Sequence, residues 1–155
     1  MLTTVTLHHT ETMLQKQGEV SMEFEQDYIM RMIKSIVSFF IKLITGKSDT
    51  VYELPSDGLY TPCDDIFARI LSLADGGKIN EAENLLYANV EPDSKDYLLM
   101  GLTFYSHINE YTDNFLSDHN YSRQEIQDGI IAFTKEFTID EMNCLSLYQT
   151  LEEML

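Results

Sequence analysis

From residue 22 to residue 45, apolar residues recur every three to four positions, which is the period of an α-helix and not of a strand. Acidic residues open this segment and lysines close it, as the helix dipole favours. The apolar arc covers more than half of the helix, so one neighbouring helix cannot cover it. We therefore predict either a core helix wrapped by several others or a helix that meets a partner. The candidate interaction surface comprises Phe24, Tyr28, Met32, Ile36, Phe39, Phe40 and Leu43.

Capping signals divide the rest of the chain into further helices. Thr61 and Pro62 form a typical helix start, and Gly76 and Gly77 a typical end. Asn80 is the predicted cap of the next helix, and Ser122 with Glu125 forms a capping box. The predicted helices span about 22–45, 61–75, 80–90, 94–118, 123–136 and 139–153. With no alternating run long enough for a sheet, we expect an all-α fold, a six-helix bundle of αα-hairpins.

The predicted hairpin of residues 61–90 invites comparison with tetratricopeptide repeats. Residues 81–86 resemble the second helix of such a repeat, whereas the aromatic and small residues of a first helix are missing around Ile66 and Leu73. The sequence thus predicts a bundle that is tetratricopeptide-like only in part. Gly101, within the next predicted helix, could allow a close helix crossing.

Net charge restricts the choice of partners. The chain of 155 residues carries −16, and residues 51–155 contribute 20 acids and 5 bases, or −15. Such a field repels phosphate backbones, so nucleic-acid binding is not expected. A protein partner or self-association is the expected interaction.

Neither a secretory signal nor a membrane span is visible. The longest apolar run, residues 36–44, is interrupted by Ser38 and Lys42 and is too short to cross a bilayer. Cys63 and Cys144 do not suggest a disulfide framework. We expect a soluble cytoplasmic protein; a peripheral membrane protein attached through helix 22–45 is an alternative.

Residues 1–21 lack a sustained period, and the amphipathic pattern begins abruptly after Met22. Residues 16–19 can be encoded by a purine-rich run containing GGAG, and two codons separate that run from Met22. This is the layout of a bacterial ribosome-binding site. We predict that 1–21 is either a disordered leader or a mis-called start, and that 22–155 is a single helical domain.

No catalytic, cofactor-binding or metal-binding motif is evident. His107 and His119 are too far apart to bind one ion from a single helical face, and Asp64 and Asp65 beside Cys63 would raise the pKa of its thiol. We therefore expect a non-enzymatic interaction module without a cofactor. The alternative is a small-molecule-binding protein or enzyme with its site near the Tyr-rich helix, at Tyr97, Tyr105, His107 and Tyr111.

Several segments are similar to a family of short helical proteins of unknown function from low-GC Gram-positive bacteria. They are residues 22–33, 52–54, 77–86 and 104–105, so the resemblance covers about 22–137. Members begin where Met22 lies, which supports the predicted start there. The resemblance implies no activity, cofactor or catalytic residue.

Overall fold

The computed structural model describes residues 3–137, 149 and 153. Within the part of the chain that it describes, all regular secondary structure is helical, which confirms the all-α fold. The six helices are α1 (Thr3–Thr45), α2 (Pro62–Asp75), α3 (Ile79–Ala88), α4 (Lys95–Asn109), α5 (Asp113–Asp118) and α6 (Arg123–Thr134). None of these described helices is long and apolar enough to cross a bilayer.

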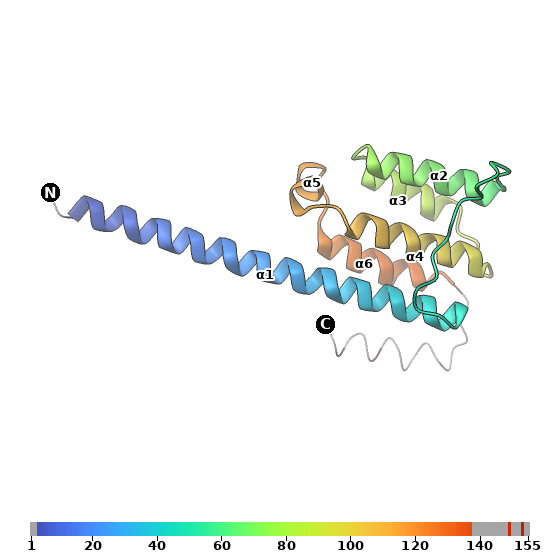
Figure 1. Ribbon diagram of the computed structural model, residues 1–155, viewed down its shortest axis with the longest axis horizontal. Helices are drawn as coiled ribbons and strands as arrows, with labels where there is room; N and C mark the ends of the chain where they lie inside the picture. The colour runs from blue at the N-terminus through green and yellow to red at the C-terminus, as the bar shows by residue number, and fades with distance from the viewer. Residues whose placement is uncertain (1–2, 138–148, 150–152, 154–155) are drawn as a thin grey trace.

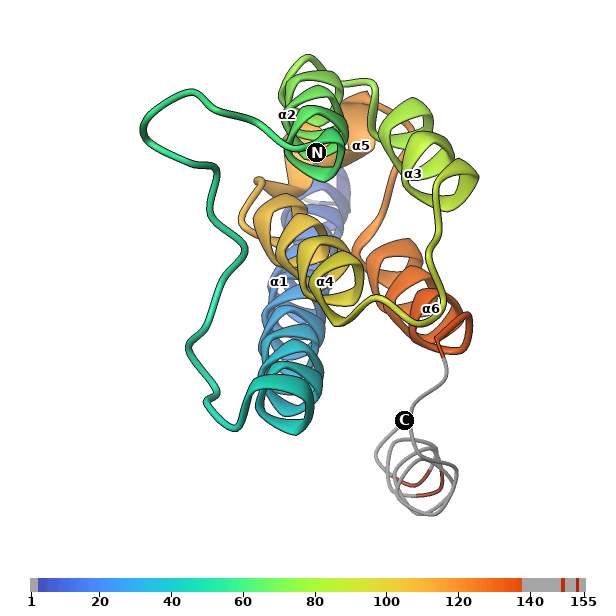
Figure 2. The ribbon, with the colours of Figure 1, turned by 90° about the vertical axis from the view of Figure 1, so that its right-hand side faces the viewer.

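The helices form three layers on the C-terminal half of α1. Helices α4 and α6 pack against α1 and against each other, and the α2–α3 hairpin packs on the far side of α4 (Figures 1 and 2). The buried residues that α1 contributes to this core, among those whose burial is described, lie between Ile33 and Ile41. Aromatic side chains of α4 and α6, including Tyr105 and Phe133, fill the centre.

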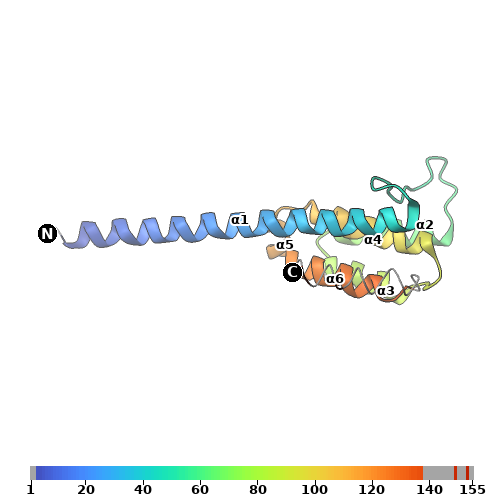
Figure 3. The same ribbon diagram turned by 90° about the horizontal axis from the view of Figure 1, so that it is seen from below.

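The N-terminal half of α1 projects from this body (Figures 1 and 3). Where the sequence predicts a disordered leader, the structure continues the helix back to Thr3. The physical reason is that residues 3–21 contain no proline, and the one glycine, Gly18, weakens a helix by about 1 kcal/mol without blocking it. A natural start at Met22 stays a prediction, which intact-mass analysis would test.

The predicted ends of α1 and α2 are confirmed. Gly46 has φ +78° and donates its N–H to Lys42, and Gly77 has φ +82° after α2. Thr61 accepts a hydrogen bond from the Asp64 N–H, and the Asp64 carboxylate accepts one from the Thr61 N–H. Both caps satisfy backbone groups that a helix end leaves unpaired.

The predicted cap of the hairpin's second helix is wrong by two residues. Helix α3 begins at Ile79, and Lys78 takes the cap position without a side-chain hydrogen bond, so Asn80 is not the cap. The Lys78 N–H bonds back to the Leu73 carbonyl at 2.8 Å, which returns the chain directly after Gly77. This turn starts the helix before Asn80 is reached.

A single helix over 94–118 is also wrong. Helix α4 ends at Asn109, and Thr112 caps α5 by accepting from the Phe115 N–H at 3.2 Å. The break is stable because Arg123 binds the carbonyls of Asn109 and Tyr111, which a continuous helix would have used internally. The helix predicted at 123–136 is confirmed as α6, and the one predicted at 139–153 lies outside the described residues, apart from residues 149 and 153.

Candidate functional site

The outward face of α1 carries a strip of exposed apolar side chains. Phe24 is 71% exposed, Tyr28 61% and Phe39 38%. Met13 and Val20 continue the series, because successive members are 7, 4, 4 and 11 residues apart and so share one helical face. We call these five residues the α1 strip. It lies opposite the face that α1 buries against α4 and α6.

The predicted interaction surface is divided by this arrangement. Ile36 and Phe40 are fully buried, so assigning them to a surface is wrong. The reason is that α4 and α6 both pack over that side of α1. Met32 and Leu43 are half-buried against the core, whereas Phe24, Tyr28 and Phe39 are exposed. The broad apolar arc therefore combines a core face with an outward face.

Met13 and Val20 are missing from the predicted surface because they precede Met22. The sequence does contain a signal for them, because Met13 and Val20 lie 11 and 4 residues before Phe24 and therefore share its helical face.

Charges between residues 19 and 42 of α1 are separated along the helix, and the exposed Lys16 lies before them. The exposed acids Glu19, Glu23, Glu25 and Asp27 precede the exposed bases Arg31, Lys34 and Lys42. Lys34 Nζ lies 2.9 Å from a Glu110 carboxylate oxygen, and an Arg31 nitrogen lies 3.9 Å from an Asp27 oxygen. These exposed pairs are weak and can exchange partners.

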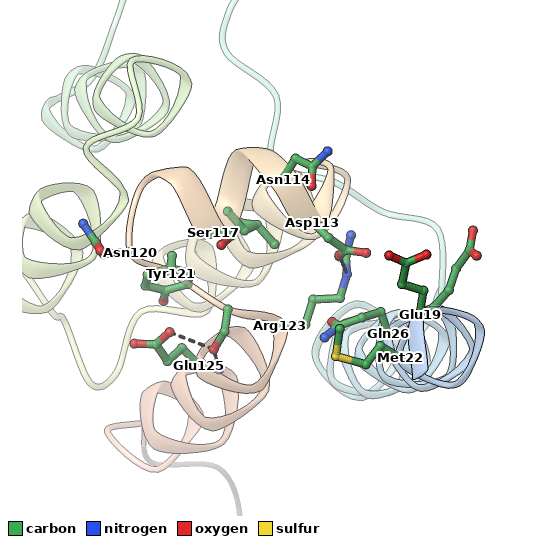
Figure 4. Close-up of a pocket in the computed structure, with 13 residues that line it drawn as sticks. Glu19, Met22, Gln26, Asp113, Asn114, Ser117, Asn120, Tyr121, Arg123 and Glu125 are labelled. Carbon is green, nitrogen blue, oxygen red and sulfur yellow. Dashed lines mark hydrogen bonds and ion pairs between the residues drawn. The ribbon is translucent and has the colours of Figure 1, made fainter. Parts of the chain in front are cut away.

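An open pocket of about 680 Å³ lies where α1 leaves the body, with α5 and the start of α6 forming its other side (Figure 4). Glu19, Met22 and Gln26 line it from α1, and Asp113 and Arg123 line it from the body. Among the described residues that line the pocket, Arg123 is the only basic one, and its guanidinium is already engaged. The pocket therefore offers an acidic rim and no free cation.

Arg123 is the centre of a buried hydrogen-bond network, and its side chain is only 5% exposed. Its Nε donates to Asp113 at 2.6 Å, and its terminal nitrogens donate to the carbonyls of Asn109 at 2.7 Å and Tyr111 at 2.8 Å. The Asn109 amide in turn donates to the Met30 carbonyl of α1 at 3.2 Å. Arg123 thus joins α4, α5 and α6 at the point where α1 enters the body.

Of the four residues of the predicted enzyme site, the structure brings together only His107 and Tyr111. His107 Nε2 lies 2.7 Å from an Asp75 carboxylate oxygen, and Tyr111 donates its hydroxyl to the same oxygen at 2.6 Å. Partial burial raises the pKa of Asp75, but the hydrogen bonds from Tyr111 and His107 lower it by more, so the pKa lies below its ordinary value. Burial and the Asp75 hydrogen bond raise the pKa of Tyr111.

Asp75→Asn should lower the free energy of unfolding at pH 7 by less than about 1 kcal/mol, because both partners are well exposed. A lowered carboxyl pKa stabilises the fold above the unfolded value of 3.8, and this contribution disappears as the pH falls through the folded pKa. Denaturation at pH 7 and pH 3 measures the difference. Glu53→Gln, at an exposed carboxyl in the 46–60 connection, is the control; equal losses at both pH values would contradict the assignment.

Tyr97 and Tyr105 lie inside the core. Tyr97 donates to the Leu86 carbonyl and Tyr105 to the Glu83 carboxylate, both at 2.7 Å. Burial raises the pKa of Tyr105, so its hydroxyl stays protonated. These tyrosines tie α4 to α3.

Cys63 contacts the Met100 sulfur at 3.6 Å, and burial raises the pKa of its thiol. A raised pKa disfavours the nucleophilic thiolate. Among the residues that the structure describes, no three His, Cys, Asp or Glu side chains gather into a group that could hold a metal ion.

Fold and surface together define an all-α protein with a small helical body and one long projecting helix that bears an exposed apolar strip. The chain belongs to a family of unknown function, DUF6483, whose pattern matches residues 23–138. The predicted resemblance to a family of unknown function is thereby confirmed. No curated protein and no solved structure matches the chain.

Proposed function

We propose that the protein is a non-enzymatic interaction module of the bacterial cytoplasm that binds a protein through the α1 strip. The observation that carries this proposal is the exposure of Phe24 and Tyr28 on a helix that has left its own core. Large side chains of this kind stabilise a contact by about 1.5–3 kcal/mol each when fully buried.

The length of α1 supports the same proposal. Its 43 residues span about 65 Å, and from residue 12 onward its first fully buried side chain is Ile33. A helical segment without tertiary contacts is only marginally stable in water, so packing against a partner would stabilise the projecting half. The partner could be another protein or a second copy.

The membrane alternative has weaker support. Four exposed acids lie between Glu19 and Asp27, beside Phe24, and they would be repelled by an anionic lipid surface. The enzyme alternative is supported by the Asp75 and His107 contact alone.

Photo-crosslinking in the native host tests the proposal. A photoreactive phenylalanine analogue replacing Tyr28 should give one dominant protein adduct, whereas the same analogue at exposed Arg69 on α2 should not. Phe24→Ser should abolish the Tyr28 adduct, because it removes a neighbour on the strip. The matched control is Leu59→Ser, an exposed apolar residue in the connection between α1 and α2, away from the strip. Equal labelling at positions 28 and 69 would contradict the proposal, and so would a yield of the Tyr28 adduct that Phe24→Ser leaves unchanged.

A further inference from the structure

We propose that the occupant of the α1 strip is the same strip of a second copy, with the two α1 helices antiparallel. This inference rests on the proposed function and names its partner. An isologous pair requires one surface that is complementary to itself. The separation of charge along α1 meets this requirement.

Charge decides the direction of the pair. In an antiparallel pair, the acidic residues 19–27 of one copy lie beside the basic residues 31–42 of the other. A parallel pair in register would instead place acids beside acids and bases beside bases. Like charges at a shared edge suppress that arrangement.

The edges of the strip show the same complementarity. Glu23, Asp27 and Lys34 share one edge of α1, because they are 4 and 7 residues apart. In an antiparallel pair, the same edge of each helix faces the same edge of the other. When position 25 of one copy lies opposite position 34 of the other, Lys34 of each copy lies between Glu23 and Asp27 of its partner. Lys34 is available because its contact with Glu110 is exposed and weak.

The same register also pairs side chains of suitable size. In this register, position 24 of one copy lies opposite position 35 of the other. Position 20 likewise lies opposite position 39, and position 28 opposite position 31. Phe24 therefore meets the small Ser35, and Val20 meets Phe39. Arg31, which is exposed, meets the ring of Tyr28, where a cation–π contact is favourable.

The described helices of the two bodies do not obstruct this pair. Each body packs on the face of α1 opposite the strip, from about Ile33 to Ile41 (Figure 3). In the antiparallel register the two bodies are displaced by about 20 Å along the helix axis and lie on opposite outer sides. Two acidic bodies are thereby kept more than a Debye length apart, which is about 8–10 Å at ordinary salt.

Charge reversal tests the pairing in the full chain by analytical ultracentrifugation. Lys34→Glu should raise the dimer dissociation constant about tenfold or more, and so should Glu23→Lys with Asp27→Lys, because each places like charges at both equivalent junctions. An equimolar mixture of the two variants should form a heterodimer at wild-type affinity, since each junction is then complementary. Lys95→Glu, at an exposed lysine at the start of α4, is the matched control for net charge.

The outcomes separate the two proposals. A wild-type chain that stays monomeric while position 28 crosslinks to a different protein would overturn self-pairing and leave the interaction module standing. Charge-reversed variants that dimerise like wild type would overturn the antiparallel register. A dimer that survives Phe24→Ser with Tyr28→Ser would show that the strip is not the dimer interface and would overturn self-pairing. Both proposals would fail if position 28 also gave no protein adduct. Circular dichroism melting confirms that each variant is folded.

Discussion

Arg123→Met should lower the free energy of unfolding by about 3 kcal/mol, one of the two largest effects that we expect from a single substitution in this chain. Methionine retains most of the side-chain volume but none of the donors. The carbonyls of Asn109 and Tyr111 then lose their partners, and an unsatisfied buried polar group costs about 1–3 kcal/mol. The loss of the contact with Asp113 adds little to the change in stability, because the Asp113 side chain is half exposed and water can hydrate it.

Denaturant unfolding measures this loss, and hydrogen exchange locates it. Exchange should accelerate first in α5 and at the end of α4, which the guanidinium joins. Arg69→Met, at an exposed arginine of α2, should change stability by less than about 0.5 kcal/mol. A similar loss for both variants would show that the network around Arg123 does not stabilise the fold.

Local signals in the sequence predicted most of the helices. Thr61, Asp64 and Gly77 act within a few residues of their own positions, so their effect can be read without the fold. The same holds for Ser122, which caps α6 through the Glu125 N–H. These boundaries depend on neighbours in sequence and were predictable, whereas the start of α3, which has no side-chain cap, was not.

The break between α4 and α5 has a different origin. The apolar spacing continues through Tyr111 and Phe115, and no glycine or proline interrupts it. The structure ends α4 there because Arg123, 14 residues beyond Asn109, binds the freed carbonyl. A tertiary hydrogen bond of this kind leaves no periodic trace in the sequence. The local signal at the break is Thr112, which caps α5, and apolar spacing alone does not reveal it.

The α1 strip was predictable in part. A broad apolar arc signals more than one packing surface, but periodicity cannot say which side the body covers. The structure assigns Ile36 and Phe40 to the core and leaves Phe24 and Tyr28 outside. The charge separation from Glu19 to Lys42 is visible in the sequence, yet it becomes an argument for pairing only once that half of α1 is seen to be free.

The second large effect concerns Gly101, where α4 crosses α6. Gly101→Ala should lower the free energy of unfolding by about 2 kcal/mol, because its methyl group would overlap the ring of Phe133. That ring cannot move freely, since it packs against Tyr87, Tyr105 and Phe137. Alanine is the better helix former by about 1 kcal/mol, so helix propensity alone would raise the stability. A loss of stability therefore shows that the overlap with Phe133 outweighs the gain in helix propensity.

Gly18→Ala is the matched control, because a methyl group there meets nothing within 4 Å and the residue also lies inside a helix. It should leave the stability of the body unchanged and raise the helicity of α1. A double-mutant cycle with Phe133→Leu then isolates the contact. Phe133→Leu creates space next to Gly101, so Gly101→Ala should cost much less in that background. Equal costs of Gly101→Ala in both backgrounds would mean that the close approach of α4 to α6 does not depend on the missing side chain.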